Sequence, residues 1–274
     1  MAFGFRIFGV NSISMQNKPF TYLFYIQYLG LRYHGWQKQP GLKTIQGKLE
    51  KVIRYVLGHE NFTILSAGRT DSGVSCHRGA FELFNTADIE LAFFIQQVNE
   101  NLPDDIRLLE GKRVSLDFNI IQDVVAKEYR YYFVIGENFH PFAAGNLTYF
   151  QGEVDIEKIK SSADIFVGEH DFRRFCAKQK QSDNYCRQIF ESEILEDKLI
   201  LADGTQLKRC CYRVKGKGFL MHQVRLMMGS LLEVGKGIIT IADIQEALKS
   251  QETSPLSGKV PANGLVLYDL EFGS

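Results

Sequence analysis

The pattern of apolar and polar positions in the first half of the chain predicts strands separated by two helices. Runs rich in aromatic and β-branched residues are typical of strands, and they cover 22–30, 62–67, 79–85, 106–115 and 127–136. Apolar residues recur with a helical period over 45–57, after a candidate N-cap at Thr44, and over 89–102, before Pro103. The order strand, helix, strand, strand, helix, strand is that of a ferredoxin-like unit, an antiparallel sheet with helices on one face.

The second half repeats this pattern less regularly. Its candidate helices cover 156–168, 219–235 and 241–249, and its candidate strands cover 187–197, 210–219 and 264–272. No low-complexity run or proline-rich linker separates the halves. We therefore predict an α+β fold of two ferredoxin-like (RRM-like) halves, 19–136 and 137–274, that share a mostly antiparallel sheet.

Composition says more about the cellular compartment of the protein than about its activity. The 274 residues hold 32 Lys plus Arg and 32 Asp plus Glu, so nucleic-acid binding would need a segregated basic face. Five cysteines without a C-x-x-C spacing favour a reducing, cytoplasmic compartment over a disulfide framework or a zinc site. Residues 1–18 are too short and polar to cross a membrane and make a poor signal peptide, and we interpret them as a disordered leader.

The stretch "SAGRTDSGVSC", residues 66–76, is the first candidate for chemistry. It sets Arg69 two residues from Asp71 between Gly68 and Gly73, which permit a tight loop at the end of a strand. One interpretation is a surface turn with a local ion pair. The other is a carboxylate oriented in a cleft.

Two further segments allow both a structural and a functional interpretation. In the candidate helix 219–235, one face carries His222, Arg225 and Gly229 and lies apart from the apolar residues of the core stripe. This face is either exposed to solvent or functional. A second histidine at helical spacing does not accompany His222, so we reject a metal site there. Alternation puts Arg213, Lys215 and Lys217 on one strand face, either a protected sheet edge or a track for phosphates. Phosphate-binding glycine motifs are absent, so we predict no nucleotide cofactor.

Taken together, several segments resemble the TruA family of tRNA pseudouridine synthases. The segments are "YHGWQKQPGLKTIQGKLEKVI", "AGRTDSGV", "NENLPDDI", "AKEYRYYF", "GFLMHQVRLMMGSLLEVG" and "PANGLVL". They occur in the family's order over about 20–272. Six motifs in register favour the functional interpretation of Asp71.

The resemblance implies an isomerase that converts uridine to pseudouridine in the anticodon stem-loop of tRNA, at positions 38–40. Asp71 would be the nucleophile, Arg69 and Arg225 would hold it ionised and aimed, and Tyr129 would stack on the extruded base. Leu265 would close the apolar side of the pocket. The implied substrate-binding set lines a central RNA-binding cleft and consists of Tyr129, Leu265, Gln37, Lys215 and Lys217. The family also implies a homodimer, with no metal, cofactor or membrane involved.

This chain departs from the usual family pattern at two places in the Asp71 loop. Ser72 stands where alanine is common, and Ser75-Cys76 replaces the usual histidine. A non-catalytic or substrate-shifted RNA-binding paralogue is therefore the alternative hypothesis. A hydrolase with an aspartate nucleophile is a third, disfavoured by the lack of a second acid or a metal motif.

Overall fold

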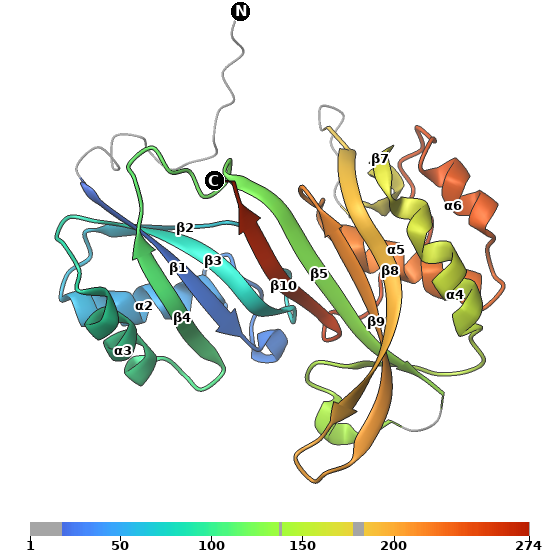
Figure 1. Ribbon diagram of the computed structural model, residues 1–274, viewed down its shortest axis with the longest axis horizontal. Helices are drawn as coiled ribbons and strands as arrows, with labels where there is room; N and C mark the ends of the chain where they lie inside the picture. The colour runs from blue at the N-terminus through green and yellow to red at the C-terminus, as the bar shows by residue number, and fades with distance from the viewer. Residues whose placement is uncertain (1–17, 137–138, 178–183, 274) are drawn as a thin grey trace, which may run out of the picture.

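A ten-stranded sheet is the framework of the computed structural model, which describes residues 18–136, 139–177 and 184–273 (Figure 1). The strands are β1 (Phe20–Tyr28), β2 (Phe62–Ser66), β3 (Ser75–Asn85), β4 (Ile106–Arg113), β5 (Val124–Ile135), β6 (Thr148–Phe150), β7 (Gly168–Asp171), β8 (Cys186–Ile200), β9 (Gln206–Gly216) and β10 (Leu265–Phe272). The helices are α2 (Ile45–Leu57), α3 (Leu91–Asn101), α4 (Ile156–Ser162), α5 (Gln223–Gly235) and α6 (Ile241–Ala247). The predicted leader lies outside the described residues apart from Lys18.

The strands follow the order β4-β1-β3-β10-β5-β9-β8-β7, with β2 beside β3 and β6 beside β5. Neighbours are antiparallel except for β3 with β10 and β5 with β6. The last strand of the chain, β10, therefore lies between two strands from the first half, as Figure 1 shows in red between β3 and β5. The prediction of a mixed α+β chain with a mostly antiparallel sheet is confirmed.

The helices pack against one face of this sheet. In the first half, Phe24 of β1 contacts Phe94 of α3, with ring centroids 5.3 Å apart. In the second half, Ser192 of β8 donates to the carbonyl of Ala163, directly after α4. Ser192 pairs with Val214, and Val214 pairs with Tyr129, so these three side chains point to the same side. Tyr129 thus lies on the helix-covered face.

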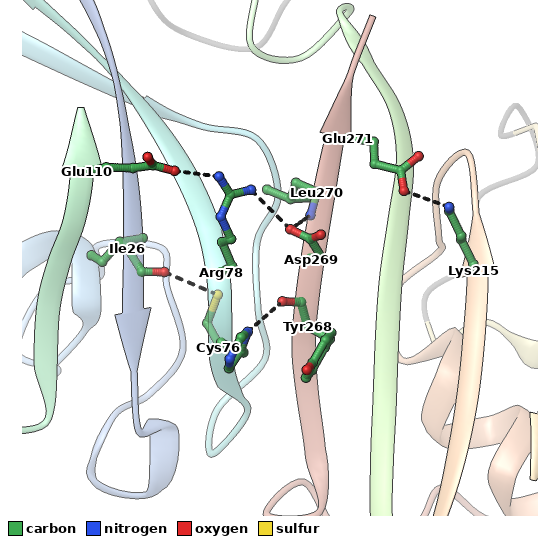
Figure 2. A network of polar contacts seen from close by, with 10 residues as sticks. Ile26, Cys76, Arg78, Glu110, Lys215, Tyr268, Asp269, Leu270 and Glu271 are labelled. Carbon is green, nitrogen blue, oxygen red and sulfur yellow. Dashed lines mark hydrogen bonds and ion pairs between the residues drawn. The ribbon is translucent and has the colours of Figure 1, made fainter. Parts of the chain in front are cut away.

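The opposite face of the central strands carries charged side chains that neutralise one another. Figure 2 shows Arg78 of β3 between Glu110 of β4 and Asp269 of β10. In the same view Lys215 of β9 forms a 2.6 Å ion pair with Glu271 of β10. This balance fits a chain whose cationic and anionic residues are equal in number.

Element bounds differ from the sequence predictions mainly in the second half. Helix α2 has the predicted bounds, and the Oγ1 of Thr44 caps it by accepting from the N–H of Gly47. The helix predicted over 219–235 begins only at Gln223, because His222 has a left-handed backbone. The helix predicted over 156–168 ends at Ser162 and continues as a 3₁₀ turn. The strand predicted over 210–219 is β9, which begins earlier and ends at Gly216.

Candidate active site

Asp71 lies in the loop between β2 and β3, and the loop that follows β1 holds it in place. The Tyr28 hydroxyl is 2.8 Å from the Thr70 hydroxyl, and the backbone N–H of Trp36 donates to the Thr70 carbonyl. Gly35 has a φ of +83°, and a Cβ there would lie 2.5 Å from the Thr70 carbonyl oxygen, so this close approach requires glycine. The residue before Asp71 is therefore fixed from two directions.

The residues that depart from the family pattern take part in this packing. The Ser72 hydroxyl is 3.4 Å from the Tyr33 carbonyl, and the Ser75 hydroxyl accepts from the N–H of Gly30. Cys76 is buried, with its sulfur directed at the Ile26 carbonyl of β1 (Figure 2). These side chains brace the Asp71 loop against β1 and the turn that follows it.

The start of helix α5 brings two nitrogen-bearing side chains to the Asp71 carboxylate. Arg225 Nη1 lies 3.9 Å from Asp71 Oδ2, and His222 Nε2 lies 3.4 Å from the same oxygen. The Asp71 side chain retains 26% of its exposure, so the carboxylate is accessible. The loop of the first half and the helix of the second half thus meet at one charged group.

Arg225 is buried, and its Nε is held by a backbone carbonyl. Its Nε donates to the Val260 carbonyl at 2.8 Å, which leaves Nη1 directed at Asp71. Burial lowers the pKa of Arg225, and the negative charge of Asp71 acts in the opposite direction. Because a guanidinium stays protonated under these conditions, Arg225 places a positive charge beside the carboxylate.

Tyr129 lies in β5 between Leu267 of β10 and Val214 of β9. Its ring meets that of Phe219 edge to face, with centroids 5.1 Å apart, and its side chain is 9% exposed. Burial raises the pKa of Tyr129, and the negative charge of Asp71 raises it further. The hydroxyl forms no hydrogen bond with another described residue.

The segment before β10 forms an apolar wall beside Tyr129. Leu265 is buried and pairs with Tyr131, two residues along the same strand face as Tyr129. The Tyr131 hydroxyl donates to the Pro261 carbonyl, and the Asn263 amide donates to the carbonyls of Ala144 and Leu147. These bonds fix the wall.

The remaining predicted site residues form no hydrogen bond or ion pair with Asp71. Arg69 is exposed and forms no ion pair with Asp71 or any other described carboxylate. Gln37 is exposed in the loop that contacts Thr70. Lys215 pairs with Glu128 across the sheet, so it lies on the face opposite Tyr129, where Glu271 binds it. Lys217 is exposed just after β9. The site roles of these four residues stay predictions.

Two residues near the site were assigned no role in the chemistry from the sequence. From the sequence only a metal site was rejected at His222, yet its Nε2 lies 3.4 Å from Asp71 Oδ2. Lys127 lies two residues before Tyr129 on the same strand face, and its Nζ donates to the Ala67 carbonyl at 2.7 Å. Burial lowers the pKa of Lys127. The alternation that placed Tyr129 also places Lys127, so that signal was available in the sequence.

Within the described ranges, His, Cys, Asp and Glu side chains do not gather in groups of three or more that could hold a metal ion. None of the described helices is both long and apolar enough to span a bilayer.

Comparisons with known proteins identify the family. The model of a family described as tRNA pseudouridine synthase matches residues 163–273. The tRNA pseudouridine synthase A of Exiguobacterium sibiricum is 34% identical over 245 residues, covering 89% of this chain and 94% of that protein. The enzyme of that name from Clostridium kluyveri is 34% identical over 242 residues, covering 88% and 95% of the two chains. That from Listeria welshimeri is 31% identical over 251 residues, covering 90% and 97%. With relatives of this identity aligned over most of both chains, this chain belongs to the family of tRNA pseudouridine synthases, which are isomerases.

Proposed function

We propose that this protein converts uridine to pseudouridine in the anticodon stem-loop of tRNA, at positions 38–40, with Asp71 as the nucleophile. Family membership supports the reaction and the class of substrate. The resemblance of the Asp71, Tyr129 and α5 motifs to the TruA pattern supports the choice of residues and of stem-loop. The observation that carries the proposal is the contact of Asp71 with Arg225 on the helix-covered face that also carries Tyr129.

The chemistry needs no external oxidant, reductant or cofactor because it is an isomerisation. The bond from N1 of the base to C1′ of the ribose breaks, and a bond from C5 to C1′ forms. The proton on C5 is lost and N1 gains one, so atoms and electrons balance. A carboxylate at Asp71 adds to the substrate and leaves again, which divides one difficult step into two.

The neighbours of Asp71 suit this sequence of steps. Arg225 places a positive charge 3.9 Å from the carboxylate oxygen, where it can orient the nucleophile toward the substrate. The Tyr129 ring offers a flat surface to an extruded base, and its hydroxyl, kept protonated by burial, would accept the C5 proton only as it passes its own proton on. Leu265 and the wall before β10 exclude water from the apolar side of the base.

The decisive experiment is pseudouridine mapping of total tRNA from cells with and without this protein, with Asp71→Asn as the matched variant. We expect positions 38–40 to carry pseudouridine only when the unaltered protein is present. The asparagine variant should bind tRNA and unfold at the same temperature as the parent while forming no product. Product at other positions would indicate a substrate-shifted paralogue, and tRNA binding without product by the unaltered protein would indicate a non-catalytic one.

Three further expectations from the sequence are part of this proposal. The chain forms a homodimer in which one tRNA touches both subunits, and it acts in the cytoplasm. Its two halves, 19–136 and 137–274, are ferredoxin-like units. The order β1, α2, β2, β3, α3, β4 supports this for the first half. Light scattering with and without tRNA tests the oligomeric state, because a single subunit per tRNA would contradict it.

A further inference from the structure

The backbone of His222 is unusual. Its φ is +62°, and it is the only residue other than glycine with a positive φ in the part of the chain that the structure describes. A side chain with a Cβ is disfavoured in this left-handed region, and such outliers persist where the surrounding structure enforces them, often at functional sites. The residue immediately precedes α5, and no capping hydrogen bond from its side chain explains the conformation.

The conformation places the imidazole between a carboxylate, that of Asp71, and an ammonium group, that of Lys259. Its Nε2 lies 3.4 Å from Asp71 Oδ2, and its Nδ1 lies 3.5 Å from the Nζ of Lys259. An ammonium group only donates hydrogen bonds, so Nδ1 accepts from Lys259. In a neutral imidazole the proton is then on Nε2, the nitrogen that faces Asp71. The contact with Lys259 therefore favours the tautomer whose N–H, on Nε2, faces the carboxylate.

The same short segment controls both partners of Asp71. Lys259 is next to Val260, whose carbonyl accepts from Arg225 Nε and whose N–H donates to the Arg225 carbonyl. Arg225 and His222 both approach Oδ2 of Asp71. Because both groups approach one oxygen, together they favour one orientation of the carboxylate.

We propose that His222 is a positioning residue for Asp71, kept in its Nε2–H tautomer by Lys259, so that Oδ1 is the oxygen that attacks. The proposal rests on the proposed role of Asp71 as nucleophile. It predicts that losing the Nε2 donor slows the chemical step without weakening the binding of tRNA, because misorientation of a reacting group raises the barrier after the substrate is bound.

Two substitutions at position 222 separate the donor from the backbone. Asparagine tolerates the left-handed conformation, but its amide is too short to reach Asp71. Glutamine places an amide N–H near the position of Nε2. We expect His222→Asn to lower kcat by at least about tenfold with KM and the melting temperature near the parent values, and His222→Gln to restore most of kcat. The assay is release of tritium from C5 of uridine in tRNA, which accompanies the new bond to C1′.

Lys259→Met provides an independent arm that leaves the backbone of His222 unaltered. It removes the donor to Nδ1, so the imidazole is free to place its proton on either nitrogen, and kcat should fall by a smaller factor than in His222→Asn. A parent-like kcat in either His222→Asn or Lys259→Met would overturn the proposal. So would a His222→Gln variant that melts like the parent and is as slow as His222→Asn.

Asp71→Asn, measured in the same assay, distinguishes failure of this inference from failure of the proposed function. If Asp71→Asn forms product at the parent rate, the nucleophile is misassigned and both proposals fall. If Asp71→Asn is inactive while His222→Asn keeps the parent kcat, only the positioning role of His222 is wrong.

Discussion

The ammonium group of Lys127 donates a 2.7 Å hydrogen bond to the carbonyl of Ala67. Lys127 is in β5, two residues before Tyr129, and Ala67 begins the loop that carries Asp71. This single bond therefore connects the strand that bears Tyr129 to the loop that bears the proposed nucleophile. Burial of Lys127, which lowers its pKa, strengthens the bond because water competes less for the ammonium group.

Replacing this lysine should slow catalysis more than it destabilises the fold. Lys127→Met keeps the length of the side chain but cannot donate to Ala67. We expect kcat for pseudouridine formation to fall by at least about tenfold, equivalent to ~1.4 kcal/mol, because the Asp71 loop loses its tie to β5. Lys127→Arg keeps a hydrogen-bond donor, so its kcat should fall by a smaller factor. Steady-state kinetics on tRNA with thermal unfolding tests this, and a parent-like kcat in Lys127→Met would show that the bond is dispensable.

Much of the fold follows from local patterns of apolar residues and helix caps. What does not follow depends on unusual backbone conformations and on long-range strand pairing. The period of 45–57 and the cap at Thr44 predict α2 correctly, since both signals are local. The predicted start of α5 is wrong because the apolar residues continue back to Phe219. In the structure the left-handed backbone of His222 and the bond from the Leu220 N–H to Gln223 Oε1 keep the helix from starting before Gln223. A pattern of apolar residues does not predict a positive φ.

The site shows the same division. Alternation correctly puts Arg213 and Lys215 on one face of β9, but it does not say which face. The register that pairs Lys215 with Glu128 places it opposite Tyr129, and this register depends on a strand far away in the sequence. Similarly, Arg69 is beside Asp71 in the sequence but makes no ion pair with it, whereas Arg225 and His222 reach Asp71 from the other half.

The two lysines of the predicted phosphate track can be separated by salt dependence. Lys215 is bound to Glu271 on the face away from Tyr129, whereas Lys217 is exposed after the strand ends. We expect Lys217→Gln to reduce the slope of log affinity for tRNA against log salt by roughly 0.7–0.9, the value of one lost phosphate contact. Lys215→Gln should leave the slope unchanged. A lower slope in Lys215→Gln alone would place the RNA on the opposite face.

Glu82 makes the stability of the fold depend on pH. It lies in β3, is 1% exposed, and accepts from the N–H of Ile120. Burial raises the pKa of Glu82 from 4.5 to about 7, and the charge of Asp123 adds to this. Because the folded state holds its proton to higher pH than the unfolded state, stability contributed by protonated Glu82 is complete below pH 4.5 and is lost as pH rises to about 7.

Glu82→Gln removes this titration while it keeps an acceptor for Ile120. We expect the variant to melt at least about 2 °C above the parent at pH 8, the shift that ~1 kcal/mol produces in a chain of this size, and to lose that advantage at pH 5. Glu153→Gln, at an exposed position, is the matched control and should show no such dependence. Melting curves across this pH range decide the matter, and a constant difference between Glu82→Gln and the parent would contradict the assignment.

Tyr129 separates a packing role from a chemical one. A buried tyrosine that only packs usually directs its hydroxyl at a protein partner, as Tyr212 does with Ser192. The hydroxyl of Tyr129 has no such partner among the described residues, and its raised pKa keeps it protonated at neutral pH. We expect Tyr129→Phe to bind tRNA like the parent but to form product about 100-fold more slowly, since the ring remains and the proton-transfer group is lost. Tyr129→Ala should lose binding of the extruded base as well.

The matched control for this pair is Tyr212→Phe, which removes a buried hydroxyl from the same sheet face away from Asp71. It should lower the melting temperature, through a loss of about 0.5–1.5 kcal/mol, and leave product formation unchanged. Single-turnover product formation and tRNA affinity, measured for all three variants, give the answer. Full activity in Tyr129→Phe would reduce that hydroxyl to a bystander, and full activity in Tyr129→Ala would remove Tyr129 from the site, because neither the ring nor the hydroxyl would then contribute to turnover.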